Sequence, residues 1–311
     1  MNQSISNELL SILACPICKG DIEAINGQLK CSKCNAVYPI KEGIPIMLPP
    51  HLEEEQKLAI STWGRDYETL LYNIKQSTQV NIVDQYGLSD YNLVTHFARK
   101  SDKNFLELGC GRARLSLLLA KQGLNIVGLD LSIEALVLAK YMFTLQKLPG
   151  FFVCGDILHP PFKSGSFSLA FAGGSIEHFE NTQQGLKAIA ESLSPHGLFI
   201  ATIPFISLST LLQGLFTGNV PDIPVLRSFL KFLYLGLMDK RHCIYGYEKS
   251  FSKIAISKYF RIADFSDIEI GPYETDYTLK FFKNQWQRKI VSHLIQLRPF
   301  WPMIYIKGKR V

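Results

Sequence analysis

The sequence predicts an α/β protein, in which a mostly parallel β-sheet with helices on both faces follows a small metal-binding unit. Three observations predict this arrangement. From residue 103 onward, short apolar segments alternate with segments of helical period, as in parallel sheets. Glycines and acids follow the first apolar segments, where ligands of such sheets bind. Four cysteines form two C-x-x-C pairs within the first 34 residues, a pattern that favours zinc.

The composition is that of a globular chain with a sizeable core. Of 311 residues, 47% are apolar and 19% are charged, which excludes a disordered tail, a collagen-like fibre and a highly charged coiled coil. Seven unevenly placed cysteines do not suit a disulfide scaffold. Neither a signal peptide nor a transmembrane run is recognisable, so we expect a cytoplasmic protein that can also lie at a membrane surface.

The first predicted element is a zinc unit in residues 1–50. Twelve residues separate the pair Cys15/Cys18 from the pair Cys31/Cys34, and the Asn-Gly at 26–27 suits a hairpin that brings the pairs together. Four thiolates can then hold one tetrahedral zinc, which would supply folding energy to so small a unit. A redox pair or a disulfide is the alternative.

The sequence after the second cysteine pair carries a more specific signature. It reads Val-Tyr-Pro-Ile at 37–40 and Glu-Gly-Ile-Pro-Ile-Met-Leu-Pro at 42–49. Together with the four cysteines, this run resembles the Trm112-like zinc-ribbon family over about residues 10–50. The resemblance implies a structural zinc site, in a unit that stabilises class I methyltransferases as a partner or as a fused segment.

Residues 51–100 are predicted to be a helical connector. Residues 52–72 have a helical pattern with three glutamates near its start, as helix N-termini favour. The run at 62–67 resembles the short cap segment that closes over the cofactor in many methyltransferases. Plain packing of Trp63 and Tyr67 is the alternative.

The large unit, residues 101–311, is predicted to alternate strands and helices. Helices are expected at 112–123 and at 132–145, the latter capped by Ser132; Ser252 is expected to cap a further helix. A last, antiparallel strand is expected at 303–307. Further strands are expected at 104–108, 125–129, 151–154, 167–172 and 198–203.

Three groups of residues at the strand ends carry the predicted chemistry. Gly109 and Gly111 follow the first strand and allow a tight turn close to a ligand. Asp130, 21 residues after Gly109, can accept hydrogen bonds from ribose hydroxyls. Asp156 follows the third strand. A nicotinamide dinucleotide site is disfavoured, because Arg114 replaces the third glycine of its fingerprint and Glu107 would repel a pyrophosphate.

Residues 107–113 resemble motif I of the class I S-adenosylmethionine-dependent methyltransferases of type 11, with Ala113 in place of the third glycine. The resemblance implies a Rossmann-like class I fold with a seven-stranded, mostly parallel sheet and S-adenosylmethionine as cofactor; a degenerate copy that binds nothing is the alternative. The residues implied to contact the cofactor are Glu107, Gly109, Cys110, Gly111, Asp130, Leu131, Asp156, Ile157 and Gly173. Within this set, Glu107, Gly109 and Gly111 would face the methionine portion of the cofactor. Asp130 would face the ribose and Asp156 would face the adenine.

Acceptor chemistry is expected after the fourth strand and in a long insert. The segment Glu177-His178 resembles the Glu-His pair of small-molecule methyltransferases, so His178 is a candidate general base with Glu177 beside it; alternatively, both only orient the next helix. The insert at about 205–250 contains a very apolar run, 225–238. It can form a lid, a membrane-interface helix or a buried packing element, and His242, Tyr245 and Tyr247 near its end could reach the acceptor.

The charge of the chain is uneven. From Tyr277 to the end there are eight Lys/Arg and no acid, while the rest has 25 basic against 27 acidic residues. Such a tail is a solvated face or attracts phosphate or anionic lipid. The sequence favours a methyltransferase for a small-molecule acceptor, including lipid- or sugar-linked ones. An RNA or protein methyltransferase that uses the zinc ribbon and the basic tail, and a non-catalytic binding module, are the alternatives.

Overall fold

The computed structural model describes residues 5–52, 54–76, 85–208, 210, 219–223, 248–273, 284–294 and 297–311. Most of the insert lies outside these residues, including the apolar run 225–238 together with His242, Tyr245 and Tyr247. The same holds for Lys280 and Lys283 of the basic tail. Of the insert, the structure describes its two ends, with β11 (Asn219–Pro221) pairing in parallel with β12 (Glu248–Ser250).

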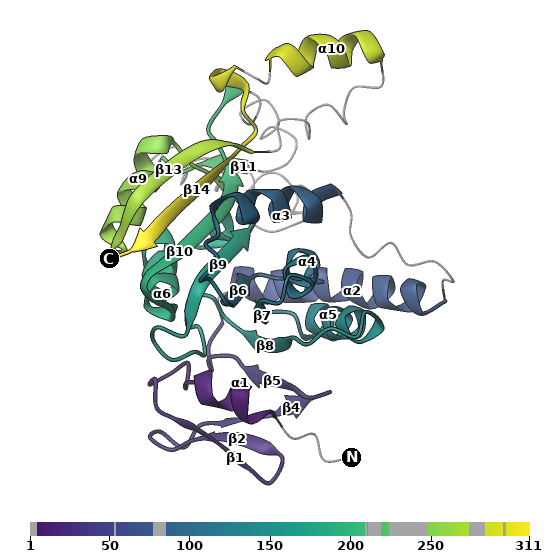
Figure 1. The fold of residues 1–311 in the computed structure, drawn as a ribbon, viewed down its shortest axis with the longest axis vertical. Helices are drawn as coiled ribbons and strands as arrows, with labels where there is room; N and C mark the ends of the chain where they lie inside the picture. Colours follow the sequence, from purple (N-terminus) through teal and green to yellow (C-terminus); the bar gives the residue numbers. More distant parts are fainter. Residues whose placement is uncertain are drawn as a thin grey trace.

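The large unit contributes seven strands to the central sheet (Figure 1). Their spatial order is β8-β7-β6-β9-β10-β14-β13, and β14 runs antiparallel to both of its neighbours while the other pairs are parallel. The bounds are β6 (Asn104–Leu108), β7 (Asn125–Asp130), β8 (Phe151–Gly155), β9 (Phe167–Gly173), β10 (Leu193–Pro204), β13 (Phe265–Tyr273) and β14 (Met303–Arg310). The mostly parallel arrangement predicted for the large unit is confirmed, with seven strands from this unit. Strand β10 begins five residues earlier than expected.

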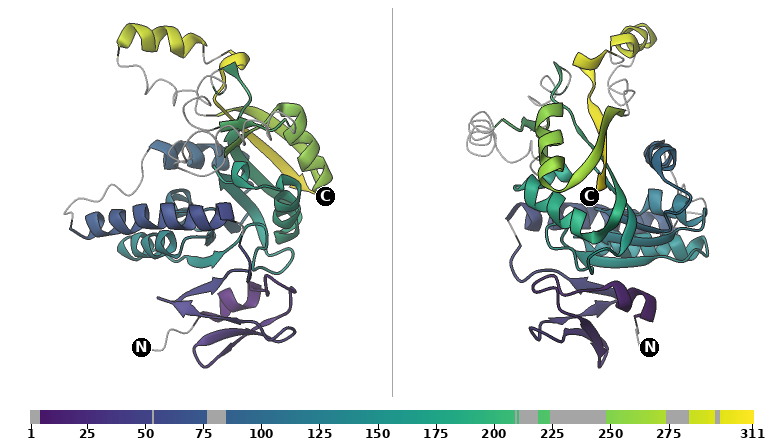
Figure 2. Two further views of the ribbon diagram at one scale, coloured as in Figure 1. Left: turned by 180° about the vertical axis from the view of Figure 1, so that it is seen from behind. Right: turned by 60° about the vertical axis from the view of Figure 1, so that its left-hand side comes forward.

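Helices cover both faces of this sheet (Figures 1 and 2). One face carries α2 (Glu54–Gln76), α3 (Gln85–Phe97), α4 (Arg114–Ala120) and α5 (Ile133–Leu145); the other carries α6 (Thr182–Ser192) and α9 (Lys253–Ile262). Ser132 and Ser252 cap α5 and α9 as predicted. The side chain of each serine accepts a hydrogen bond from the backbone N–H three residues further along the chain. Helix α4 begins at Arg114, two residues later than predicted, because Ala113 has a left-handed conformation with φ of 54°.

The N-terminal unit is a small ribbon that joins the large sheet. It contains α1 (Asn7–Ile12), β1 (Ile22–Ile25), β2 (Gln28–Cys31), β3 (Val37–Tyr38), β4 (Ile40–Lys41) and β5 (Ile44–Met47). Asn26 and Gly27 form the predicted hairpin turn, both with positive φ. Strand β5 pairs in parallel with β8, with Ile46 opposite Cys154. The sheet therefore continues through β5 to β4 and has nine strands.

The ribbon also shares its hydrophobic core with the large unit. Leu13 and Tyr38 of the ribbon belong to the same buried cluster as Phe162, Phe167 and the residues beneath α6 and α9. A second cluster fills the space beneath α4 and α5. Since burial of apolar surface is the main stabilising term in folding, the ribbon and the sheet stabilise each other.

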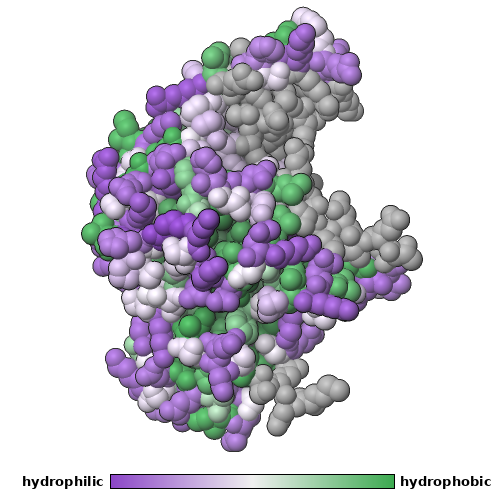
Figure 3. Space-filling model, in the orientation of Figure 1, coloured by the Kyte–Doolittle hydropathy of each residue, from purple (hydrophilic) through white to green (hydrophobic). Residues whose placement is uncertain are grey.

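Among the described residues, two further helices lie between β13 and β14. Helix α10 (Gln285–Leu294) and the short helix η5 (Arg298–Phe300) precede the last strand, and α10 stands at the end of the molecule opposite the ribbon (Figure 1). On the face shown in Figure 3, hydrophilic and hydrophobic side chains alternate over the whole body. Among the residues described, no helix is both long and apolar enough to cross a membrane.

Candidate functional site

A cavity of about 400 Å³ opens at the carboxyl ends of β6, β7, β8 and β9. This is the edge of an α/β sheet at which ligands bind, and the size is that of a small-molecule site. All nine residues predicted to contact a cofactor line it: Glu107, Gly109, Cys110, Gly111, Asp130, Leu131, Asp156, Ile157 and Gly173. The structure thus brings together side chains from four loops that are distant in the sequence.

The turn after β6 requires glycine at two positions. Gly109 has a φ of 64°, and a Cβ there would lie 2.2 Å from Oγ of Ser175. Gly111 has a φ of 50°, and a Cβ there would lie 2.5 Å from the hydroxyl oxygen of Tyr67. Because other residues adopt these angles only with strain, the two glycines keep the floor of the cavity open.

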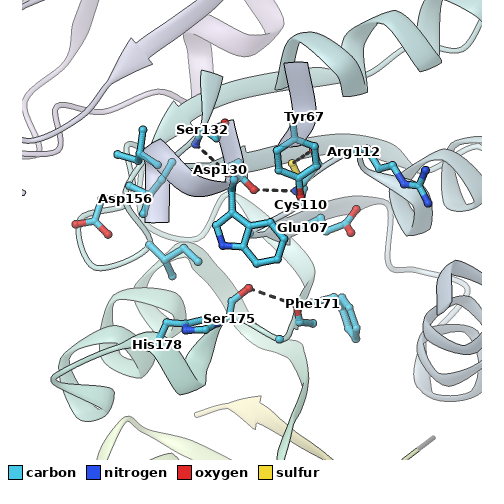
Figure 4. A pocket seen from close by; sticks show the side chains of 18 of the residues that line it. Tyr67, Glu107, Cys110, Arg112, Asp130, Ser132, Asp156, Phe171, Ser175 and His178 are labelled. Atoms are coloured by element: carbon cyan, nitrogen blue, oxygen red, sulfur yellow. Dashed lines mark hydrogen bonds between the residues drawn. The ribbon is translucent and has the colours of Figure 1, made fainter. Parts of the chain in front are cut away.

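Asp130 is fixed at the centre of the site by two backbone donors (Figure 4). The N–H of Gly111 donates to Oδ2 at 2.8 Å, and the N–H of Ser132 donates to Oδ1 at 2.9 Å. Each carboxylate oxygen can accept a further hydrogen bond. A ribose with two neighbouring hydroxyls matches this remaining capacity.

The cavity has two chemically different ends, because Asp156 and Arg112 lie on opposite sides of Asp130 in Figure 4. Asp156 is buried. Its carboxylate accepts a hydrogen bond of 2.9 Å from the N–H of Leu158, and it lies 3.0 Å from Nδ1 of His159. Around Asp156 the walls are apolar, since Leu131, Ile157 and Leu158 line the cavity there.

The opposite end is charged. Glu107 is buried and accepts a hydrogen bond of 3.0 Å from the N–H of Ser116, and burial raises its pKa to about 7. Asp90, Arg112 and Arg114 line the same cavity. An end that offers both carboxylates and guanidinium groups can hold a zwitterion such as the amino-acid portion of S-adenosylmethionine.

Helix α2 covers the cavity with one face. Gln56, Ile60, Trp63, Tyr67 and Leu70 all line it, and their spacing of three and four residues places them on one side of a helix. The phenol of Tyr67 lies beside the Gly111 turn, and burial raises its pKa well above the ordinary value. Residues 62–67 therefore lie over the predicted cofactor site; that they open and close over it stays a prediction.

The predicted Glu177-His178 pair is divided by the structure. Both belong to the short helix η1 (Ile176–His178), and His178 lines the cavity whereas Glu177 is buried and is not among the lining residues. Oε2 of Glu177 is buried without a hydrogen-bond partner among the described residues, and burial raises the pKa of Glu177 to about 8. His178 is thus placed to meet a ligand; its role as a base stays a prediction.

Sequence reasoning missed several lining residues. Ser175 donates a hydrogen bond of 3.3 Å to the carbonyl oxygen of Leu108 and closes the floor beneath Gly109. Asp90 lies on α3 and belongs to no recognisable sequence motif. In the sequence, Arg114 was interpreted only as the replacement of a glycine. A cation directly after an acidic glycine-rich turn could have indicated a residue that lines the site.

The four ribbon cysteines converge on one point. The Sγ atoms of Cys15, Cys18, Cys31 and Cys34 all lie within 4.8 Å of one another. The pairs Cys15–Cys34 and Cys18–Cys31 are 3.6 and 3.5 Å apart, close to the ~3.8 Å edge of a tetrahedron with Zn–S bonds of about 2.3 Å. The set fits a structural zinc ion, and the hydroxyl of Tyr38, 3.0 Å from Sγ of Cys15, adds a partner for one thiolate.

The ribbon holds the loop that begins at Asp156. The N–H of Ala14 donates to the carbonyl oxygen of Pro161 at 3.0 Å, and the N–H of Lys163 donates to the carbonyl oxygen of Ile12 at 2.8 Å. Nζ of Lys19 donates to the carbonyl oxygen of Pro160 at 2.5 Å. The ribbon therefore supports the apolar end of the cavity although it lines none of it.

Comparisons with known proteins match both parts of the chain. Residues 106–201 match the family described as "Methyltransferase domain", and residues 6–43 match "Trm112p-like protein". The UPF0434 protein of Vibrio campbellii is 46% identical over 48 residues, which are 15% of this chain and 81% of that protein.

Solved structures show the same fold at low identity. Phosphoethanolamine N-methyltransferase 2 of Haemonchus contortus, in complex with S-adenosyl-L-methionine, has a TM-score of 0.54 at 17% identity, over 86% of this chain and 61% of that one. A chain from the complex between the Haloferax volcanii Trm112 methyltransferase activator and the putative methyltransferase has a TM-score of 0.53 at 14% identity, over 83% of this chain and 98% of that one.

These matches agree with the seven-stranded sheet, the cavity at its carboxyl edge and the cluster of four cysteines. Through its N-terminal segment, which matches the Trm112p-like model, the chain therefore belongs to the family of the UPF0434 proteins, and it joins this segment to a domain with the fold of S-adenosylmethionine-dependent methyltransferases.

Proposed function

We propose that this protein transfers a methyl group from S-adenosylmethionine to a small-molecule acceptor, lipid- or sugar-linked acceptors included. The observation that carries the proposal is the arrangement of one cavity around Asp130, with an apolar end at Asp156, a charged end at Glu107 and Arg114, and His178 on a third wall. These surroundings match the adenine, ribose and amino-acid portions of the ligand.

S-adenosylmethionine, when bound, supplies an electrophilic methyl group on a sulfonium. The chain has to hold the ligand, exclude water and align the acceptor with the methyl group. Asp130 would hold the ribose hydroxyls, Trp63 and Tyr67 of α2 would cover the site, and the imidazole of His178 would accept a proton from an acceptor that loses one.

The ribbon is proposed to act as a built-in activator of the domain. A Trm112 activator is part of the Haloferax volcanii complex, one chain of which shares this fold. Here the pairing of β5 with β8 and the hydrogen bonds to residues 160–163 support the loop after Asp156. A zinc-loaded ribbon would thereby help to keep the adenine end of the cavity in shape.

Methylation of RNA or protein is the second candidate, and the resemblance of the ribbon to a Trm112 activator favours it. Lys307 and Lys309 of the basic tail, however, pair with Glu269 and Asp267 at 3.1 and 2.9 Å. A smaller part of the tail is therefore available for phosphate than its composition indicates.

Calorimetric titration with S-adenosylmethionine tests the proposal. We expect saturable binding by the wild-type protein and a loss of about 30-fold or more in affinity for Asp130→Ala, because two charge-assisted hydrogen bonds disappear. Formation of S-adenosylhomocysteine with lipid extracts, sugar metabolites or RNA then identifies the acceptor class. A folded, zinc-loaded protein that binds no S-adenosylmethionine would refute the enzyme and leave the binding-module alternative.

A further inference from the structure

We propose that α10 and the residues around it dock on a bilayer that contains anionic lipid, and that this contact turns the cofactor edge of the domain towards the membrane surface. The proposal concerns a surface distant from the cavity. Only its consequence, that a lipid-linked acceptor reaches the cavity, rests on the proposed methyl transfer.

Helix α10 presents large apolar side chains to solvent. Trp286 is 69% exposed and Ile290 is 42% exposed, and Leu297, just beyond the helix, is 54% exposed. Trp286 and Ile290 are four residues apart and so share one side of α10, while Leu297 follows the end of the helix. Tryptophan and aliphatic side chains on one face are typical of helices that lie in the membrane interface.

Cations accompany this face. Lys289 and Arg298 are exposed, and Nζ of Lys253 lies 4.7 Å from the centre of the Trp301 ring. Arg298 is near enough to Lys253 to oppose its charge, and no acidic residue follows Asp276 in the sequence. Cations beside exposed apolar side chains complement anionic lipid headgroups above a hydrocarbon layer.

The chain topology places α10 at the cofactor edge. Strand β14 is antiparallel to both β10 and β13, so β13 runs in the same direction as β10 and ends at the same edge. The segment between Tyr273 and Met303, which contains α10, therefore leaves and re-enters the sheet at the carboxyl edge where the cavity opens. Tyr273 itself bonds to Asp90 on the cavity wall.

Helix α10 lies at one end of the molecule. The helix stands away from the sheet in both Figure 1 and Figure 2, and at this end of the molecule Figure 3 shows isolated hydrophobic residues among hydrophilic ones. RNA would need the cations but gains little from Ile290 and Leu297, so the observations favour a bilayer.

Flotation of the full chain with vesicles tests the proposal. We expect binding to phosphatidylcholine vesicles with about 30% phosphatidylglycerol, weaker binding to phosphatidylcholine alone, and loss of most binding at about 0.5 M salt. The double variant Trp286→Ser/Ile290→Ser should bind about tenfold more weakly, and Lys289→Glu/Arg298→Glu should lose a similar factor on anionic vesicles only. Leu145→Ser, which changes a side chain 44% exposed on α5, is the matched control and should bind as wild type.

Binding of S-adenosylhomocysteine, measured for each variant, separates this proposal from the proposed function. Variants that still bind S-adenosylhomocysteine but no longer bind the vesicles would support the proposed docking surface. Equal vesicle binding by wild type and both double variants would overturn it, as would a wild-type protein that ignores anionic vesicles. Salt-sensitive binding to RNA in place of vesicles would also overturn it and assign the surface to nucleic acid.

Discussion

The hydroxyl group of Tyr273, at the end of β13, donates a hydrogen bond of 2.5 Å to Oδ1 of Asp90 on α3. The two residues are 183 positions apart in the sequence, and Asp90 lines the cavity. This contact connects the charged end of the site to a strand at the far edge of the sheet. Helix α3 is thus held in place over the cavity from a distant part of the chain.

Removing this hydrogen bond should weaken cofactor binding. Tyr273→Phe keeps the ring and deletes the donor, so we expect the affinity for S-adenosylhomocysteine to fall about fivefold, which corresponds to one hydrogen bond. Calorimetry measures the change. Tyr305→Phe, which deletes a hydrogen bond of 3.0 Å to Glu269 on the neighbouring strand, is the control and should leave the affinity unchanged. Equal losses in both variants would contradict the specific role of Asp90.

The charged end of the cavity should recognise the amino-acid portion of the ligand. Arg114→Gln is expected to weaken S-adenosylhomocysteine binding about tenfold or more, because a charge-assisted hydrogen bond to a carboxylate is lost. Binding of methylthioadenosine, which lacks the amino acid, should not change. Arg65→Gln removes an exposed guanidinium on α2 and should affect neither ligand. If Arg114→Gln weakened both ligands alike, the arginine would be structural.

Glu107 should make the stability of the folded protein depend on pH. Burial raises its folded-state pKa to about 7, above the ordinary value of about 4.3, so the proton that it retains stabilises the folded ligand-free protein at low pH. This stabilisation is complete below about pH 4.3 and is lost as the pH rises through about 7, a change of about 4 kcal/mol at most. At pH 8, Glu107→Gln should therefore unfold at a higher urea concentration than wild type.

A cationic ligand favours the ionised carboxylate of Glu107. Affinity for S-adenosylmethionine should therefore rise about tenfold between pH 6 and pH 8, as the ionised fraction grows. Glu107→Gln should flatten this profile, and methylthioadenosine should show none of it. A profile that persists in Glu107→Gln would assign the pH dependence to another group.

Loss of the ribbon metal should destabilise the methyltransferase domain as well as the ribbon. Because Leu13 and Tyr38 share a core with Phe162, we expect Cys31→Ser or chelation to lower the single unfolding midpoint by about 10 °C or more. Hydrogen exchange at the amides of Ala14 and Lys163, which join the ribbon to the loop after Asp156, should accelerate at the same time. Added zinc should reverse the effect of chelation. Two separate transitions, with the domain unaffected, would show that the units are independent.

The sequence predicted the local elements well because their signals are local. Apolar periods located the strands of the central sheet, and Ser132 and Ser252 were recognised as helix caps from their position before a helical pattern. The glycines at 109 and 111, Asp130 and the cysteine pairs were found because backbone conformation and ligand chemistry restrict those positions to few residue types.

Contacts between distant segments could not be predicted in the same way. The pairing of β5 with β8, the hydrogen bond between Tyr273 and Asp90, and the separation of Glu177 from the cavity that His178 lines depend on how helices and strands pack. Neither the residue type at position 90 nor that at position 273 indicates that the two side chains are in contact. The sequence by itself determined the elements, the cysteine pairs and the strand-end motifs, since these follow from short-range pattern. Tertiary structure alone decided which of them share a cavity, because packing and burial set distances and pKa values across the whole chain.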